Sequence, residues 1–143
     1  MIETISESNI EEVLPLIRKY QEFYQVLDID EDKNSVFFSQ FGEGSEKGCL
    51  FAYRWDDKLV AFATVYFSFS SSITSKVAIL NDLYTLNEYR RKGIAKKLIQ
   101  HCERFGKSKG AVRLQWLTAA DNKEAQSLYN SLGAKQSSWE FFN

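Results

Sequence analysis

The chain has 143 residues, of which 44% are hydrophobic, 15% aromatic and 26% charged, and its formal net charge is −1. This size and composition are typical of one globular domain, spanning residues 1–143, that can bury a sizeable core. The mildly acidic balance of charges argues against a nucleic-acid partner. No apolar run reaches the ~20 residues of a membrane span. The single histidine and the two separate cysteines form no metal-binding motif.

The N-terminal third is expected to hold a strand and two helices. Ile2–Ile5 reads as a short strand, and the capping box Ser8–Glu11 predicts that a helix starts near Asn9. A second short helix is expected to carry Val36, Phe37, Phe38 and Phe41. Because Met1–Ile5 lacks the basic start and apolar core of a signal peptide, a cytoplasmic location with reduced thiols is predicted.

The middle of the chain predicts three strands. Cys49–Trp55 and Leu59–Ser68 are rich in strand-forming residues, and the Asp-Asp-Lys segment between them indicates a hairpin. A serine-rich connection, Ser68–Ser75, then leads into a third strand, Val77–Thr85.

The turn after this strand reads Arg-Arg-Lys-Gly-Ile-Ala and precedes an amphipathic helix that extends to about Ser108. A helix that starts here has unpaired N–H groups and the positive end of its dipole directed outward. Gly93 lets an anion approach the backbone, and three basic residues that oppose the dipole favour a bound pyrophosphate. The alternative is a solvated basic first turn. The residues expected at this site are Arg90, Arg91, Lys92, Gly93, Ile94 and Ala95.

A fourth strand, Val112–Thr118, leads into a second helical pattern that begins at Asn122. Apolar residues recur there at helical spacing, and Gly133 is well placed to end the helix. The stripe consists of Ala125, Leu128, Tyr129 and Leu132.

Two motifs follow each other along these elements: Arg-x-x-Gly-x-Ala lies between a strand and a helix, and Asn-x-x-Ala-x-x-Leu-Tyr-x-x-x-Gly comes after the next strand. Together they resemble the GNAT superfamily of acetyl-CoA-dependent N-acetyltransferases over Ile79–Gly133. The remaining elements fit the same fold. The expected class is α/β of the α+β kind, with the order βααβββαβαβ. We expect a mixed, mostly antiparallel sheet with helices on both faces and a splayed parallel strand pair at the centre. The resemblance implies acetyl-CoA as co-substrate and no metal.

The resemblance also implies where the pantetheine arm of the co-substrate lies. In the family the arm occupies the gap between the parallel strands, and backbone N–H groups of the first strand bind the arm and the thioester carbonyl. By position, those groups belong here to Leu83, Tyr84 and Thr85. Asn122 resembles the side chain that reaches the pantetheine amide, and a helix N-cap is its alternative role.

Two residues resemble groups that handle protons in the family. Tyr129 matches the tyrosine that donates a proton to the coenzyme A thiolate, with a core aromatic as the alternative. Asp82 lies beside the expected acetyl position, where polyamine acetyltransferases, which Leu80–Tyr84 also resembles, bind the amine. Asn81 stands where those enzymes tend to carry a second acid, a departure that puts polyamine specificity in doubt. Deprotonation through water by Asp82 and the absence of a dedicated base both stay open.

The tail Ala134–Asn143 is short for the two strands that family members usually have there. Its aromatic residues alternate around Glu140 and cannot bury themselves within so short a strand. We therefore predict a last strand that packs against a second copy of the chain as a homodimer, with an intramolecular edge strand as the alternative. The aromatic residues concerned are Trp139, Phe141 and Phe142.

Charge is distributed unevenly along the chain. Residues 1–46 hold 11 acidic and 3 basic residues, whereas residues 47–143 hold 8 acidic and 15 basic residues. The positive part suits a polyanionic co-substrate, and the negative part suits a cationic amine. We predict acetyl transfer from acetyl-CoA to the primary amine of a small cationic molecule, without a nucleic-acid or membrane partner. The alternatives are acetylation of a protein N-terminus or lysine, and a non-catalytic acyl-CoA-binding regulatory module.

Overall fold

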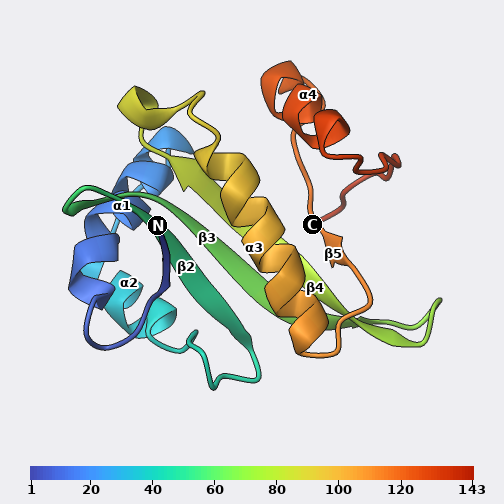
Figure 1. Cartoon of the computed structure of the whole chain (residues 1–143), viewed down its shortest axis with the longest axis horizontal. Coiled ribbons are helices and arrows are strands. Elements are labelled where there is room, and N and C mark those ends of the chain that lie inside the picture. The colour runs from blue at the N-terminus through green and yellow to red at the C-terminus, as the bar shows by residue number, and fades with distance from the viewer.

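Five strands form one mixed sheet in the order β1–β2–β3–β4–β5 in the computed structural model, which describes residues 1–143 (Figure 1). The first four strands pair antiparallel, and β5 runs parallel to β4. The predicted combination of antiparallel strands and one parallel step is therefore confirmed. The strands are β1 (Ile2–Thr4), β2 (Gly48–Trp55), β3 (Lys58–Ser70), β4 (Ser75–Thr85) and β5 (Leu114–Gln115).

Helices cover both faces of this sheet (Figure 1). On one face, Tyr20 of α1 packs edge-on against Phe62 of β3, with ring centroids 5.5 Å apart. On the other face, Phe105 of α3 packs against Phe51 of β2 at 5.0 Å. Because side chains along a strand alternate between faces, this double cover buries β3 from Leu59 to Val65. The helices are α1 (Ile10–Phe23), α2 (Glu31–Phe38), α3 (Ile94–Ser108) and α4 (Lys123–Ser131), and a 3₁₀ turn spans Asn87–Tyr89.

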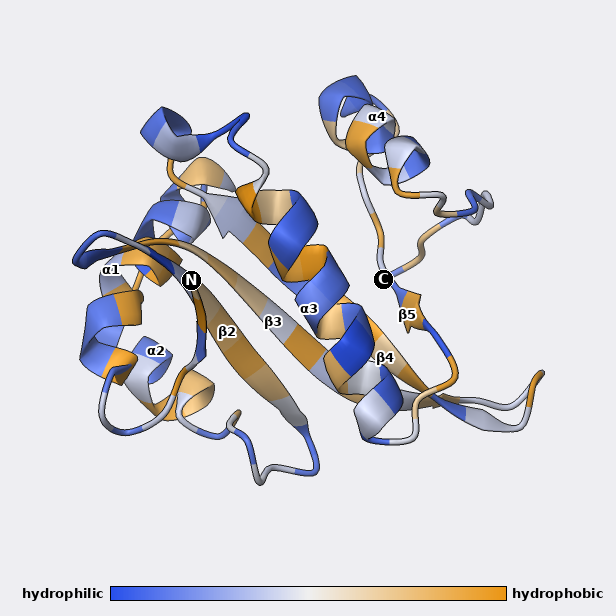
Figure 2. Ribbon diagram, viewed as in Figure 1, coloured by the Kyte–Doolittle hydropathy of each residue, from blue (hydrophilic) through white to orange (hydrophobic).

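The packing of α3 on β4 determines where the preceding turn lies. The helix buries Ile94, Leu98 and Cys102, while its outward side is hydrophilic (Figure 2). Gly106 permits a close approach, because a Cβ added there would lie 2.9 Å from the Cβ of Ala78 on β4. Since α3 runs back along β4 from this contact, its first turn lies beside the C-terminal end of that strand (Figure 1).

Strand β4 departs from regular pairing on both of its edges. On the β3 side, Thr64 pairs with Asp82 and the next residue pairs with Leu80, so Asn81 is an extra residue in a β-bulge. On the other side, β5 pairs only with Ala78 and its neighbour Ile79. After Ile79, the edge of β4 that faces away from β3 pairs with no strand, because β5 has ended and the chain diverges from β4.

The tail Ala134–Asn143 forms no strand, and this corrects the predicted element order to βααβββαβα. The parallel pair consequently lies at the edge of the sheet, because no strand follows β5 in it. The physical reason is that β5 offers only two paired residues as a template. The tail side chains of Trp139 and Phe142 are each 88% exposed.

Other element boundaries differ in smaller ways. The helix expected to start near Asn9 is confirmed, because α1 begins at Ile10. Phe41, expected within the second helix, lies beyond its end at Phe38 and packs against Tyr66. The fourth strand is much shorter than the predicted Val112–Thr118, since pairing to β4 stops where the strands diverge. None of the helices is both long and apolar enough to cross a bilayer.

Candidate functional site

The turn before α3 presents unpaired backbone donors. Gly93 precedes the helix with a φ of 80°, in the left-handed region that glycine tolerates, and no side chain caps the first N–H groups. A Cβ added to Gly93 would meet no atom within 4 Å, so the space above the turn is open. Ile94 is buried beneath the turn, Ala95 is partly buried, and the first helical turn holds no acidic residue. This end of the helix is therefore suited to receive an anion.

The three cations of the turn point in different directions. Arg90 donates from Nε to the carbonyl oxygen of Thr85 at 3.0 Å and extends its guanidinium over the ring of Phe23 on α1. Lys92 lies over Trp55, with Nζ 5.7 Å from the ring centroid. The side chain of Arg91 is 83% exposed and pairs at 3.5 Å with Glu124 in the first turn of α4. The turn is thus tied to α1, to the β2–β3 hairpin and to α4.

The segment expected to bind the pantetheine arm lies where β4 has no strand on its outer edge. Leu83 and Tyr84 are partly buried there, and Thr85 is buried. Asn122 stands at the start of α4, where its Oδ1 accepts a hydrogen bond from the backbone N–H of Ala125 at 3.2 Å. This is the N-cap role, and it leaves the side-chain Nδ2 as a donor.

Asp82 is a buried carboxylate, 7% exposed, on the face of the sheet that α1 covers. Its Oδ1 accepts a hydrogen bond from the hydroxyl of Tyr20 at 2.7 Å and one from Nδ2 of Asn81 at 3.2 Å. Its Oδ2 accepts a hydrogen bond from the hydroxyl of Thr64 at 2.5 Å. Three neutral donors therefore stabilise the charge of this carboxylate within the protein.

Tyr20 and Thr64 are site residues that sequence reasoning missed. Tyr20 was placed on the apolar face of the first helix, and Thr64 lies in the interior of a predicted strand. Burial raises the pKa of Tyr20, and the negative charge of Asp82 raises it further; the same two causes raise the pKa of Tyr66 on β3. Both hydroxyls therefore stay protonated at neutral pH.

Tyr129 lies on α4, with its ring 5.2 Å from that of Trp116 in an edge-on contact. Burial raises the pKa of Tyr129, the side chain of Thr118 opposes this rise, and Tyr24, the residue after α1, adds slightly to it. The hydroxyl is thus protonated at neutral pH. It makes no hydrogen bond with Asp82, so the two residues expected to handle protons occupy separate positions.

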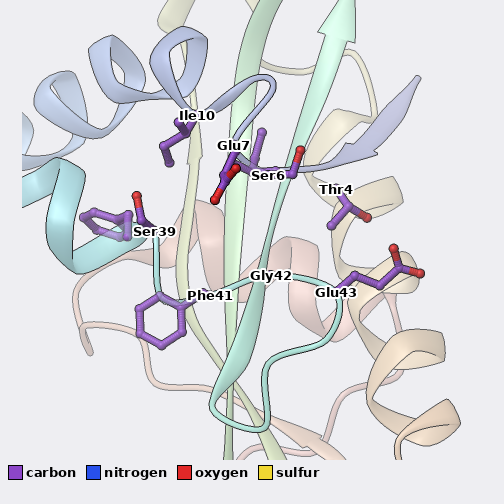
Figure 3. A pocket seen from close by; sticks show the side chains of 10 residues that line it. Thr4, Ser6, Glu7, Ile10, Ser39, Phe41, Gly42 and Glu43 are labelled. Atoms are coloured by element: carbon purple, nitrogen blue, oxygen red, sulfur yellow. The ribbon is translucent and has the colours of Figure 1, made fainter.

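A cavity of about 350 Å³ lies away from these residues, between the segment after β1 and the segment after α2 (Figure 3). Glu7 and Ile10 line it from one side, and Ser39 and Phe41 line it from the other. It contains none of the residues around Asp82 or the turn before α3. The structure also contains no group of three or more His, Cys, Asp or Glu side chains arranged to hold a metal.

Comparisons with known proteins agree on one family. The family model described as the acetyltransferase (GNAT) family matches residues 13–134. An uncharacterized N-acetyltransferase, YhfO of Bacillus subtilis (strain 168), is 29% identical over 124 residues, which cover 87% of this chain and 82% of the relative. A thialysine N-epsilon-acetyltransferase of Bos taurus is 29% identical over 94% of this chain and 84% of its own length. The solved structure of a probable acetyltransferase has a TM-score of 0.86 and 29% identity, covering 100% of this chain and 95% of that one.

Proposed function

We propose, from the premise that this chain belongs to the GNAT acetyltransferase family, that it moves the acetyl group of acetyl-CoA to the primary amine of a small cationic molecule. Family membership makes the protein an acyltransferase. The observation that carries the finer proposal is the position of a buried carboxylate, Asp82, on the same strand end that leads into the open helix N-terminus at Gly93.

The residues around Gly93 fit the anionic part of acetyl-CoA. The N–H groups of Ile94 and Ala95 would bind the pyrophosphate, because a helix N-terminus stabilises negative charge and the space above Gly93 is open. Arg91 and Lys92 add positive charge at the rim. The arm would then extend along the unaccompanied edge of β4, where backbone groups of Leu83, Tyr84 and Thr85 and the amide of Asn122 bind it.

Acetyl-CoA supplies an activated thioester when it is bound. Tyr129 would donate its hydroxyl proton to the sulfur that leaves, and its raised pKa keeps that proton in place before the reaction. The negative charge of Asp82 would attract the cationic acceptor, and its carboxylate would take up the proton that the ammonium loses before attack. The exclusion of water by the partly buried Tyr84 and its aromatic neighbours would strengthen both effects.

Cationic acceptors are favoured by two features. Asp82 is a buried negative charge, and residues 1–46, which supply α1 and α2, hold 11 acidic and 3 basic residues. The bovine relative is named for thialysine, which is itself an amine. Because Cys49 and Cys102 are both free and buried, we also propose a cytoplasmic location.

We expect cationic primary amines to give the highest kcat/KM, and we expect that value to fall as salt rises because ions screen long-range attraction. The measurement is thiol release from acetyl-CoA with diamines, lysine analogues, neutral amines and peptides with a free N-terminus. Assays without an amine measure background hydrolysis. A preference for neutral or anionic acceptors would contradict the charge argument. Preferred peptides would indicate a protein acetyltransferase, and no turnover with any acceptor would indicate a non-catalytic module.

We also propose that the aromatic tail joins two copies of the chain. Trp139, Phe141 and Phe142 are 88%, 79% and 88% exposed, and apolar surface of this kind favours association. Replacing all three with serine is expected to shift the mass measured by light scattering toward the monomer. Replacing Lys135 and Gln136 with serine in the same tail is the matched control. A wild-type chain that is already monomeric at micromolar concentration would refute the proposal.

A further inference from the structure

Asp82 has almost no capacity left for a direct contact with an acceptor. A carboxylate offers about four acceptor positions, and three of them bind Tyr20, Asn81 and Thr64. Thr64 is fully buried, and Asp82 itself is only 7% exposed. An amine that approaches from the α1 face therefore meets the groups around the carboxylate before it meets the carboxylate.

Among the three residues that donate to Asp82, Tyr20 contacts both the carboxylate and the aromatic residues around it. Its hydroxyl donates to Asp82, while the residue as a whole is partly exposed on α1. Its ring is bordered by Tyr24 at 4.9 Å and by Tyr84 at 6.0 Å, and Tyr24 is 61% exposed. The phenolic oxygen gives its one proton to the hydrogen bond with the carboxylate, and its lone pairs can accept a further hydrogen bond.

Tyr20 differs from the other tyrosines near Asp82 in donating a hydrogen bond to its carboxylate. Burial and the charge of Asp82 raise the pKa of Tyr66, but its hydroxyl makes no hydrogen bond with Asp82. Tyr24 and Tyr84 contact Tyr20 through their rings and make no hydrogen bond with Asp82. Among these tyrosine hydroxyls, only that of Tyr20 donates to Asp82, and it belongs to a partly exposed residue.

We propose that Tyr20 relays the proton of the acceptor ammonium to Asp82, an inference that rests on the proposed acetyl transfer to an amine. An N–H bond of the ammonium breaks, and its proton binds the oxygen of Tyr20. At the same time the O–H bond of Tyr20 breaks, and that proton binds Oδ1 of Asp82. The products are a neutral amine with a free electron pair, a neutral tyrosine and a protonated carboxyl group. No tyrosinate forms, which agrees with the raised pKa of Tyr20, and the proton returns to solvent by the reverse path.

The relay predicts that Tyr20→Phe lowers kcat/KM for the amine by about 10²-fold while the affinity for acetyl-CoA stays unchanged. The ring is retained, so its contacts with Phe62 and Tyr84 persist. Tyr24→Phe is the matched control, because it removes a neighbouring hydroxyl that is not bonded to Asp82, and it should retain wild-type activity. Circular dichroism and thermal melts of each variant separate loss of activity from loss of fold.

A double-mutant cycle with Asp82→Asn sharpens the test. Because the two residues act as one path, the double variant should be no slower than the slower single variant. A proton inventory in mixed light and heavy water should be curved for the wild type and linear for Tyr20→Phe, since two protons move together only in the former. Additive losses in the cycle, or a Tyr20→Phe enzyme within threefold of an active wild type, would refute the relay alone. A wild type that acetylates no primary amine would instead refute the proposed function and with it the relay.

Discussion

Replacing Tyr129 with phenylalanine is expected to lower kcat by about 10²- to 10⁴-fold, the range for the loss of a positioned proton donor. The ring contact with Trp116 does not involve the hydroxyl, so packing and acetyl-CoA affinity should change little. The proposed donation of a proton to the leaving sulfur predicts that the loss appears in kcat and not in binding. Steady-state kinetics together with calorimetric titration of acetyl-CoA measure the two effects separately.

Tyr89→Phe is the matched control for this variant. Tyr89 is partly buried, and its ring packs against Trp55 of β2 and not against Trp116. Its replacement should leave kcat unchanged. A structural role for Tyr129 predicts the opposite pattern, a lower melting temperature at near-normal turnover. A Tyr129→Phe enzyme with kcat within a few-fold of wild type would show that the role of Tyr129 is structural.

Gly93→Val is expected to weaken acetyl-CoA binding by about 10²-fold, because the new side chain would occupy the space through which the pyrophosphate reaches the backbone. The loss of two charge-assisted hydrogen bonds at roughly 1.5 kcal/mol each corresponds to a change of this size. The backbone at Gly93 has a φ of 80°, so the variant also carries strain of about 1–2 kcal/mol. Calorimetric titration with acetyl-CoA is the measurement.

Gly133→Val separates the strain from the loss of the binding site. Gly133 has the same φ of 80° and equally open space around an added Cβ, but it ends α4 and lies at no predicted binding position. Both variants should therefore lose similar amounts of stability, and only Gly93→Val should lose affinity. Equal affinities of Gly93→Val and wild type would exclude the turn as the pyrophosphate site.

Features that depend on local sequence could be predicted. The apolar run Val77–Thr85 lies within β4, and the helix expected after the turn is α3. Gly93 stands in the turn between these two elements, as expected, and its φ of 80° is one that glycine readily adopts. The N-cap role of Asn122 was one of its two expected roles, because asparagine commonly satisfies the first N–H groups of a helix.

Features that depend on distant contacts could not be predicted in the same way. Tyr20 and Asp82 are 62 positions apart, and nothing in either local pattern indicates that they share a hydrogen bond. Arg90 was grouped with the pyrophosphate site by its position in the motif, whereas its guanidinium extends toward Phe23, which belongs to a different helix. The last strand was wrong for a related reason, because a strand requires a partner edge and β5 provides only two paired residues.

The bulge at Asn81 also has a consequence for the curvature of β4. Thr64 pairs with Asp82 and Val65 pairs with Leu80, so deleting Asn81 would restore an uninterrupted ladder with both halves still facing the same helices. Pairing alone therefore gives no reason for the extra residue. What a bulge adds is a bend and a stronger local twist, and the bend falls between the part of β4 that pairs with β5 and the part that carries Asp82. Deleting Asn81 would therefore keep the pairing and remove the bend and the added twist of β4.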